Sequence, residues 1–162
     1  MLPFLVMTGT GLLLLVLDPL LAPERRDRLP LISLGGVVVT AAIVILRRGQ
    51  PEIVFGGMLA ADGFATFCNL LFLLVAGLTL LISIAYIRHT GLERGEYSAL
   101  LLFSTLGMMI MASSLDLMTI FLGLETLSIS LYILAGFLRE RLESNESALK
   151  YLLLGAFASG FL

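Results

Sequence analysis

The sequence predicts an all-α protein, a polytopic bundle of transmembrane helices whose N-terminus lies outside the membrane. Of its 162 residues, 59% are hydrophobic and only 14% are charged, whereas soluble domains have about half and about a quarter. The apolar residues form segments close to the roughly 20 residues that a helix needs to cross a bilayer. The basic residues gather in alternate loops, which indicates a fixed orientation.

Six segments are predicted to cross the membrane as helices, which satisfy their backbone hydrogen bonds internally. They are Leu2–Leu21, Leu29–Leu46, Leu59–Ile87, Tyr97–Ser114, Leu117–Leu138 and Ala148 onward. No stretch shows the alternating ten-residue blocks of a membrane barrel. The first segment is interpreted as a span, because its basic residues follow the apolar run and a signal peptide has them ahead of it. The third is long enough to begin as an interfacial turn around Ala60–Phe64.

The loops fix the predicted orientation through their arginines, since cytoplasmic loops carry an excess of basic residues. With the N-terminus outside, the external loops hold only Arg47 and Arg48. The cytoplasmic loops hold Arg25, Arg26, Arg28, Arg88, Arg94, Arg139 and Arg141. The sixth segment, from Ala148 to Leu162, is about 22 Å of helix at 1.5 Å per residue, and it is interpreted as the start of a span in a longer polypeptide.

Glu125 lies near the middle of the fifth predicted span. A charged side chain at a helix centre costs about 2.5–3.5 kcal/mol on the insertion scale. Ser128 and Tyr132 follow at helical spacing and share its face. A carboxylate at mid-depth on a polar stripe favours a proton or ion path. The alternative is a neutral, structural Glu125 bonded to a neighbouring helix.

Lys150 lies early in the sixth segment, four residues after Glu146, in the order that favours an ion pair on one helix face. Two interpretations stay open: a pair at the start of the helix with Lys150 reaching toward the interface, or a proton-accessible step into the interior. Lys150 and Glu125 differ in depth by more than about 10 Å on helical geometry, so no direct pair is expected. The partner of Glu125 is expected beyond Leu162.

The remaining polar residues indicate packing rather than chemistry. Asp18 is predicted to be a boundary residue, and Asp62 a cap at the start of a helix. Gly155 and its small neighbours predict close packing of the sixth helix. Interhelical hydrogen bonds are predicted for Asn69, Thr79, Ser83, Ser104 and Thr105.

Several classes of function are excluded by what the sequence lacks. Its net charge of −2 gives no indication of a nucleic-acid partner. The single cysteine, Cys68, provides neither an iron–sulfur ligand set nor a metal site. There is no phosphate-binding loop and no dinucleotide fingerprint. The chain is therefore expected to bind no cofactor.

Two stretches resemble a known family. They are "EYSALLLFSTLGMMIMASSLDLMTIFLGLETLSISLYILAGF" (residues 96–137) and "ESNESALKYLLLGAFASGF" (residues 143–161). Both resemble subunit N of bacterial proton-pumping NADH:quinone oxidoreductase, respiratory complex I. The trio Gly123-Leu124-Glu125 and the segment Ala148–Tyr151 favour subunit N over its antiporter-like siblings, which typically carry a Trp before the glutamate. The resemblance is looser over residues 1–95.

The resemblance implies a longer helix bundle with inverted repeats and broken helices. Residues 1–95 would hold spans one to three, and residues 96–162 would begin the antiporter-like repeat. Glu125 would match a glutamate that pairs with a buried lysine of a later helix. Lys150 and Glu146 would match motif positions on the sixth helix.

The implied function is proton translocation coupled to electron transfer from NADH to quinone. The chain would act as a non-redox translocase subunit in the bacterial inner membrane, with other membrane subunits of complex I as its partners. NADH, FMN, iron–sulfur clusters and quinone would bind to other subunits. Two alternatives stay open: a subunit of a cation/proton antiporter, and a structural spacer of the membrane arm.

Overall fold

The fold is taken from a computed structural model, which describes residues 1–21, 28–49, 52–90 and 95–161, with the backbone alone at residues 52 and 85–90. The described residues form six α-helices and one β-hairpin. The helices are α1 (Leu2–Leu20), α2 (Leu29–Leu46), α3 (Gly63–Thr90), α4 (Gly95–Ser113), α5 (Leu117–Ala135) and α6 (Leu142–Ser159). The hairpin joins β1 (Glu52–Val54) to β2 (Leu59–Ala61) through a short 3-10 helix, η2 (Phe55–Gly57). The predicted helical bundle is confirmed.

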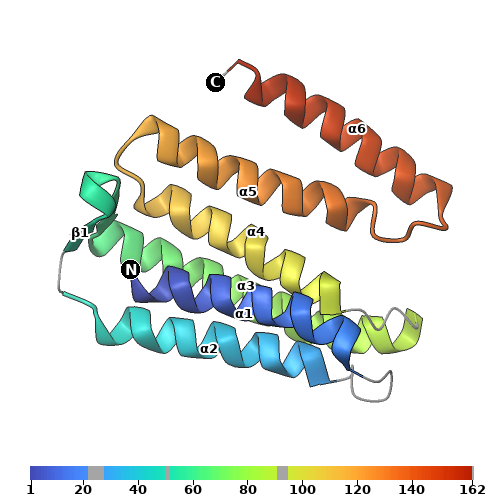
Figure 1. The fold of residues 1–162 in the computed structure, drawn as a ribbon, viewed down its shortest axis with the longest axis horizontal. Coiled ribbons are helices and arrows are strands. Elements are labelled where there is room, and N and C mark those ends of the chain that lie inside the picture. Colours follow the sequence, from blue (N-terminus) through green and yellow to red (C-terminus); the bar gives the residue numbers. More distant parts are fainter. Residues whose placement is uncertain (22–27, 50–51, 91–94, 162) are drawn as a thin grey trace.

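The helices lie side by side along one axis (Figure 1). Helices α1 to α4 form a bundle, α5 packs on α4, and α6 lies on the outer side of α5. The N-terminus, the hairpin and the turn between α4 and α5 share one end of the bundle. The five helices α1 to α5 are long and apolar enough to cross a membrane.

The sixth predicted span forms a helix, but its bounds differ from the prediction. It begins at Leu142, six residues before Ala148, and its first two turns contain Glu143, Asn145 and Glu146. These polar turns distinguish α6 in composition from the five apolar helices α1 to α5. The outward orientation of the N-terminus stays a prediction, and three of the arginines that support it, Arg25, Arg26 and Arg94, lie outside the described residues.

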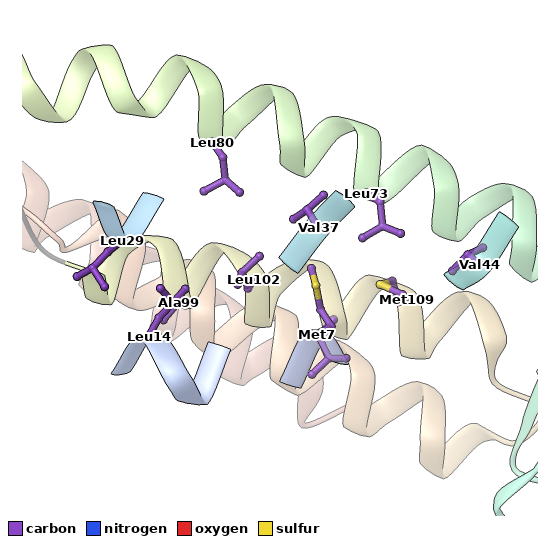
Figure 2. Packing of buried hydrophobic residues seen from close by; sticks show 11 residues of the cluster. Met7, Leu14, Leu29, Val37, Val44, Leu73, Leu80, Ala99, Leu102 and Met109 are labelled. Atoms are coloured by element: carbon purple, nitrogen blue, oxygen red, sulfur yellow. The ribbon is translucent and has the colours of Figure 1, made fainter. Parts of the chain in front are cut away.

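The core forms where one stripe of each helix in the bundle meets the others. Its residues recur at a spacing of seven along the chain, two helical turns, as in Met7 and Leu14, Val37 and Val44, or Leu73 and Leu80 (Figure 2). The cluster also includes Leu29, Ala99, Leu102, Leu106 and Met109. Apolar residues on the opposite faces stay exposed, for example Ile82 at 72%, so these helices are apolar all round, as expected for helices in contact with lipid.

Hydroxyl and amide groups join α3 to α4 at two places. Asn69 donates from Nδ2 to Ser113 Oγ at 3.4 Å, and the hydroxyls of Ser83 and Tyr97 lie 3.0 Å apart. The interhelical prediction is therefore confirmed for Asn69 and Ser83. It is wrong for three residues, whose hydroxyls donate to carbonyls of their own helix, because that acceptor lies within reach on any helix; these are Thr79, Ser104 and Thr105.

The third helix begins later than predicted. Residues Leu59–Ala61 form strand β2, and the helix starts at Gly63. Asp62 Oδ1 accepts a hydrogen bond from the amide of Ala65 at 2.7 Å, the standard arrangement of a residue that caps a helix N-terminus. The predicted cap at Asp62 is confirmed.

The β-hairpin was missed by the sequence reasoning. Gly56 and Gly57 carry the turn with φ of +65° and +102°, a conformation that costs glycine least. The amide of Leu115 donates a hydrogen bond to the carbonyl of Met58 at 2.9 Å. This bond links the hairpin to the turn between α4 and α5. The available signal was a Gly-Gly pair after a run of β-favouring residues.

Helix α5 begins at a second capped position. Asp116 accepts hydrogen bonds from the Thr119 hydroxyl at 2.6 Å and from the Thr119 amide at 2.9 Å. These two bonds, the hydroxyl first, hold the pKa of the Asp116 carboxyl below its usual value, against a smaller opposing effect of burial. A carboxyl with a lowered pKa stabilises the folded state above its ordinary pKa, and that contribution is lost as the pH falls through the lowered value.

We therefore expect part of the acid sensitivity of the protein to come from Asp116. Asp116→Asn keeps an acceptor at the cap but does not ionise, so the midpoint of thermal unfolding should become less dependent on pH below about 4, the ordinary Asp value. Thermal unfolding in detergent between neutral and acidic pH measures this. Because the carboxyl is screened by solvent, the effect is expected to be small. An unchanged acid dependence in Asp116→Asn would exclude this role.

Candidate functional site

The position of α5 is set by a contact between two glycines. A Cβ added to Gly107 of α4 would lie 2.6 Å from the carbonyl oxygen of Gly123 on α5. A Cβ added to Gly123 would lie 2.7 Å from Met111 Cγ and 2.9 Å from the Gly107 carbonyl oxygen. Both distances are too short for a real side chain, so the two backbones touch only because these residues are glycines. This contact fixes which face of α5 meets α4.

The rotation of α5 places Glu125 away from α4. Successive residues of a helix are about 100° apart, so Glu125 lies on the side of α5 opposite Gly123. Gly123 and Ser130 are buried, while Glu125 is half-buried. Ser128 and Tyr132 share the face of Glu125, as the spacing predicted.

Tyr132 shows that this face points toward α6. Its ring lies 4.9 Å from the ring of Tyr151 in an edge-to-face arrangement, which is a favourable geometry for aromatic pairs. Its hydroxyl occupies the space over Gly155, where any Cβ would collide with it. The close packing predicted for Gly155 is confirmed. Tyr132 is thus a packing residue between α5 and α6, whatever further role it has.

Glu125 and Ser128 lack partners within the part of the chain that the structure describes. Neither side chain makes a hydrogen bond there, and Glu125 makes no ion pair. Both lie in the middle turns of a helix that is long and apolar enough to span a membrane. A carboxylate at such a depth requires compensation from another polar group, so this face of α5 is suited to contact polar groups that lie outside the described residues.

Lys150 pairs with Glu146 rather than with Glu125. Its Nζ lies 2.5 Å from Glu146 Oε1, and the two side chains are 70% and 58% exposed. Tyr151, the next residue, meets Tyr132, which lies seven residues, about 10 Å of helix, from Glu125. The prediction that Lys150 and Glu125 do not pair directly is confirmed. The exposure of the Lys150–Glu146 pair makes it a weak contributor to stability.

The connection between α5 and α6 is held by side chains of the first turn of α6. The Ser144 hydroxyl donates to the carbonyl of Ala135 at 2.7 Å, and Asn145 Nδ2 donates to the carbonyl of Arg139 at 2.9 Å. Carbonyls at a helix C-terminus lack partners within the helix, and Ser144 supplies one to α5. These bonds position the Glu146–Lys150 pair at the end of α5 opposite its Asp116 cap.

Asp18 has a structural role that the sequence reasoning missed. Its side chain is only 7% exposed, and Oδ1 accepts a hydrogen bond from the amide of Gly95 at 3.1 Å. Gly95 is the first residue of α4, so the carboxylate lies where the helix dipole favours a negative charge. A Cβ at Gly95 would lie 2.6 Å from Leu29 Cδ1 and 3.2 Å from Asp18. Nothing in the local sequence predicts this contact, because the two residues are 77 positions apart.

Across the described residues, no group of three or more His, Cys, Asp or Glu side chains is placed to hold a metal ion. The α5–α6 pair carries the Glu125 carboxylate and the Ser128 hydroxyl in the middle turns of α5, and the Lys150 ammonium at the far end of the helix pair.

Comparison with known proteins gives a family for this arrangement. The family model for "NADH:quinone oxidoreductase/Mrp antiporter, TM" matches residues 114–162, which include α5 and α6. NADH-quinone oxidoreductase subunit N of Chloroflexus aggregans is 43% identical over 160 residues, covering 98% of this chain and 33% of the relative. The subunit N of Trichlorobacter lovleyi is 42% identical over 160 residues, with coverages of 99% and 33%.

Solved structures also match this chain. A chain of respiratory complex I from Thermus thermophilus with bound aureothin matches with a TM-score of 0.78 and 33% identity, over 98% of this chain and 34% of that one. A chain of the archaeal membrane-bound sulfane sulfur reductase has the same fold, with a TM-score of 0.76 at 22% identity. The sequence spans about one third of the length of the relatives it matches. Over that third, the chain belongs to the family of NADH-quinone oxidoreductase subunit N.

Proposed function

We propose that this chain contributes to proton translocation as part of a membrane-arm subunit of NADH:quinone oxidoreductase. The observation that carries the proposal is the Glu125 carboxylate. It lies in the middle turns of an apolar helix, faces away from α4, and has no partner among the described residues. The similarity to subunit N extends over 98% of this chain.

In the proposed mechanism, Glu125 exchanges protons in response to a basic group from another part of the subunit. An opposite charge within about 4–6 Å favours the ionised carboxylate, and burial without such a neighbour favours the protonated form. Movement of the basic group toward and away from Glu125 would then release and take up a proton. Electron transfer from NADH to quinone, in partner subunits that carry the redox groups, would drive that movement.

We propose further that Lys150 and Glu146 form the step between the cytoplasmic surface and the interior, with Ser128 and Tyr132 along the face between them and Glu125. The polar first turns of α6, which contain Glu143, Asn145 and Glu146, support access from water. On this proposal the chain binds no cofactor itself, works beside the other membrane subunits of complex I in the bacterial inner membrane, and begins its antiporter-like repeat within residues 96–162.

A cation/proton antiporter subunit is the second candidate, because the matching family description includes Mrp antiporters. The experiment that separates the two is purification of the complete tagged subunit from native membranes. We expect subunits that carry flavin and iron–sulfur clusters to co-purify, and NADH-dependent quinone reduction in proteoliposomes to move protons. Purification without redox subunits, together with cation-dependent proton exchange, would support the antiporter and contradict our proposal.

A further inference from the structure

A small cavity lies at the end of the bundle that holds the hairpin. Its volume is about 50 Å³. Four helices contribute to it, at the start of α1, the end of α2, the start of α3 and the end of α4 (compare Figure 1). The polar side chains that line it are Arg47, Thr66, Asn69 and Ser113.

Asn69, one of the residues that line this cavity, has a buried side-chain atom without a hydrogen-bond partner. The residue is only 6% exposed. Its Nδ2 donates to Ser113 Oγ at 3.4 Å, while its Oδ1 has no hydrogen-bond partner and is fully buried. If the amide is turned over, Oδ1 accepts from Ser113 and the NH₂ group is left unpaired. Either orientation leaves one buried amide atom without a partner, which native proteins almost always avoid.

The size and the lining of the cavity indicate which kind of molecule can hydrogen-bond to the unpaired amide atom of Asn69. A water molecule needs roughly 10–15 Å³ of such space and two to four polar partners. The cavity is larger than this, and four polar side chains line it. Sites for organic ligands are about 300–1,000 Å³, which excludes a lipid headgroup or a quinone ring. Water also suits both orientations of the amide, since it donates as well as accepts hydrogen bonds.

We propose that this cavity is a binding site for ordered water, with one molecule bonded to the free amide atom of Asn69 and bridging to the other polar side chains of the lining. The direct Asn69–Ser113 bond is long, and the water strengthens the junction of α3 with α4. Leu59, three residues before the Asp62 cap of α3, pairs with Ser114, the residue after Ser113, so the same junction holds the hairpin on the end of the bundle.

A cryo-electron microscopy map of the intact complex, at a resolution that shows waters elsewhere in the membrane arm, tests the proposal. We expect compact density within hydrogen-bonding distance of the Asn69 amide. Asn69→Leu should remove that density. Asn145→Leu, the same change at an exposed amide of α6, should leave it in place.

The wild-type map is decisive even if Asn69→Leu does not assemble. An unfilled cavity in that map, or the elongated density of an acyl chain, would overturn the proposal. So would density that persists unchanged in a folded Asn69→Leu complex. None of these outcomes depends on proton translocation, so the water site is tested separately from the proposed function.

Discussion

Glu125→Gln in the complete complex is expected to reduce proton translocation to a small fraction of the wild-type value for each quinone reduced. Glutamine keeps the size and the hydrogen-bonding capacity of the side chain but cannot exchange a proton. Glu125 lies on the face of α5 that points away from α4, so the change should leave the packing of the bundle intact. Acidification and quinone reduction, recorded together in proteoliposomes, measure the result.

Two further variants define what Glu125 contributes. Glu125→Asp keeps the charge but shortens the side chain by one methylene, so partial recovery would show that charge matters more than reach. Glu143→Gln is the matched control, because Glu143 is exposed in the first turn of α6, and we expect it to pump normally. Full pumping by Glu125→Gln would remove Glu125 from the proton path. Full pumping by Glu125→Ala as well would favour the structural spacer.

Gly123→Val is expected to have the largest effect on stability. The new side chain would meet the backbone of Gly107 and the side chain of Met111, and the Gly107 backbone cannot move aside as a flexible side chain can. Overpacking of a well-packed interior costs about 1–3 kcal/mol and sometimes more. The thermal unfolding midpoint of the subunit in detergent, and the yield of assembled complex, should both fall.

Gly35→Val is the control for this experiment. Gly35 lies in the middle of α2, and a Cβ there meets nothing within 4 Å, so it has the same change in helix propensity without the collision. The difference between the two variants isolates the contact between α4 and α5. Equal losses in both would show that helix propensity, not the glycine contact, limits the stability. A milder Gly123→Ala variant that assembles should also pump poorly, since rotation of α5 displaces Glu125.

The features of the fold that depend on composition and short-range chemistry could be predicted from the sequence, and others could not. The five long helices and the Asp62 cap followed from composition and from short-range chemistry, because apolar segments of that length bury backbone polar groups only as helices. The start of α6 was placed too late because its first turns are polar, and hydropathy alone does not detect a polar helix. The hairpin was missed because its strands are only three residues long.

The candidate site likewise combines features that the sequence predicted with contacts that only the structure showed. The sequence identified Glu125, Ser128 and Tyr132 as one face, since helical periodicity is a local property. It also excluded a direct pair between Lys150 and Glu125, because rise per residue fixes depth. It did not reveal that Tyr132 packs over Gly155, or that Asp18 binds the amide at the start of α4. Those contacts join residues on different helices, and many pairs of positions would satisfy the same local rules.

The sequence by itself determined that this is a membrane bundle with an ionisable side chain at the middle of its fifth helix. The cost of leaving a charge or a backbone polar group in hydrocarbon allows few other interpretations. Only the tertiary structure decided which way that side chain faces. Direction depends on the rotation of α5, and the rotation is set by the contact of Gly123 with Gly107, where the absence of two side chains lets the backbones meet.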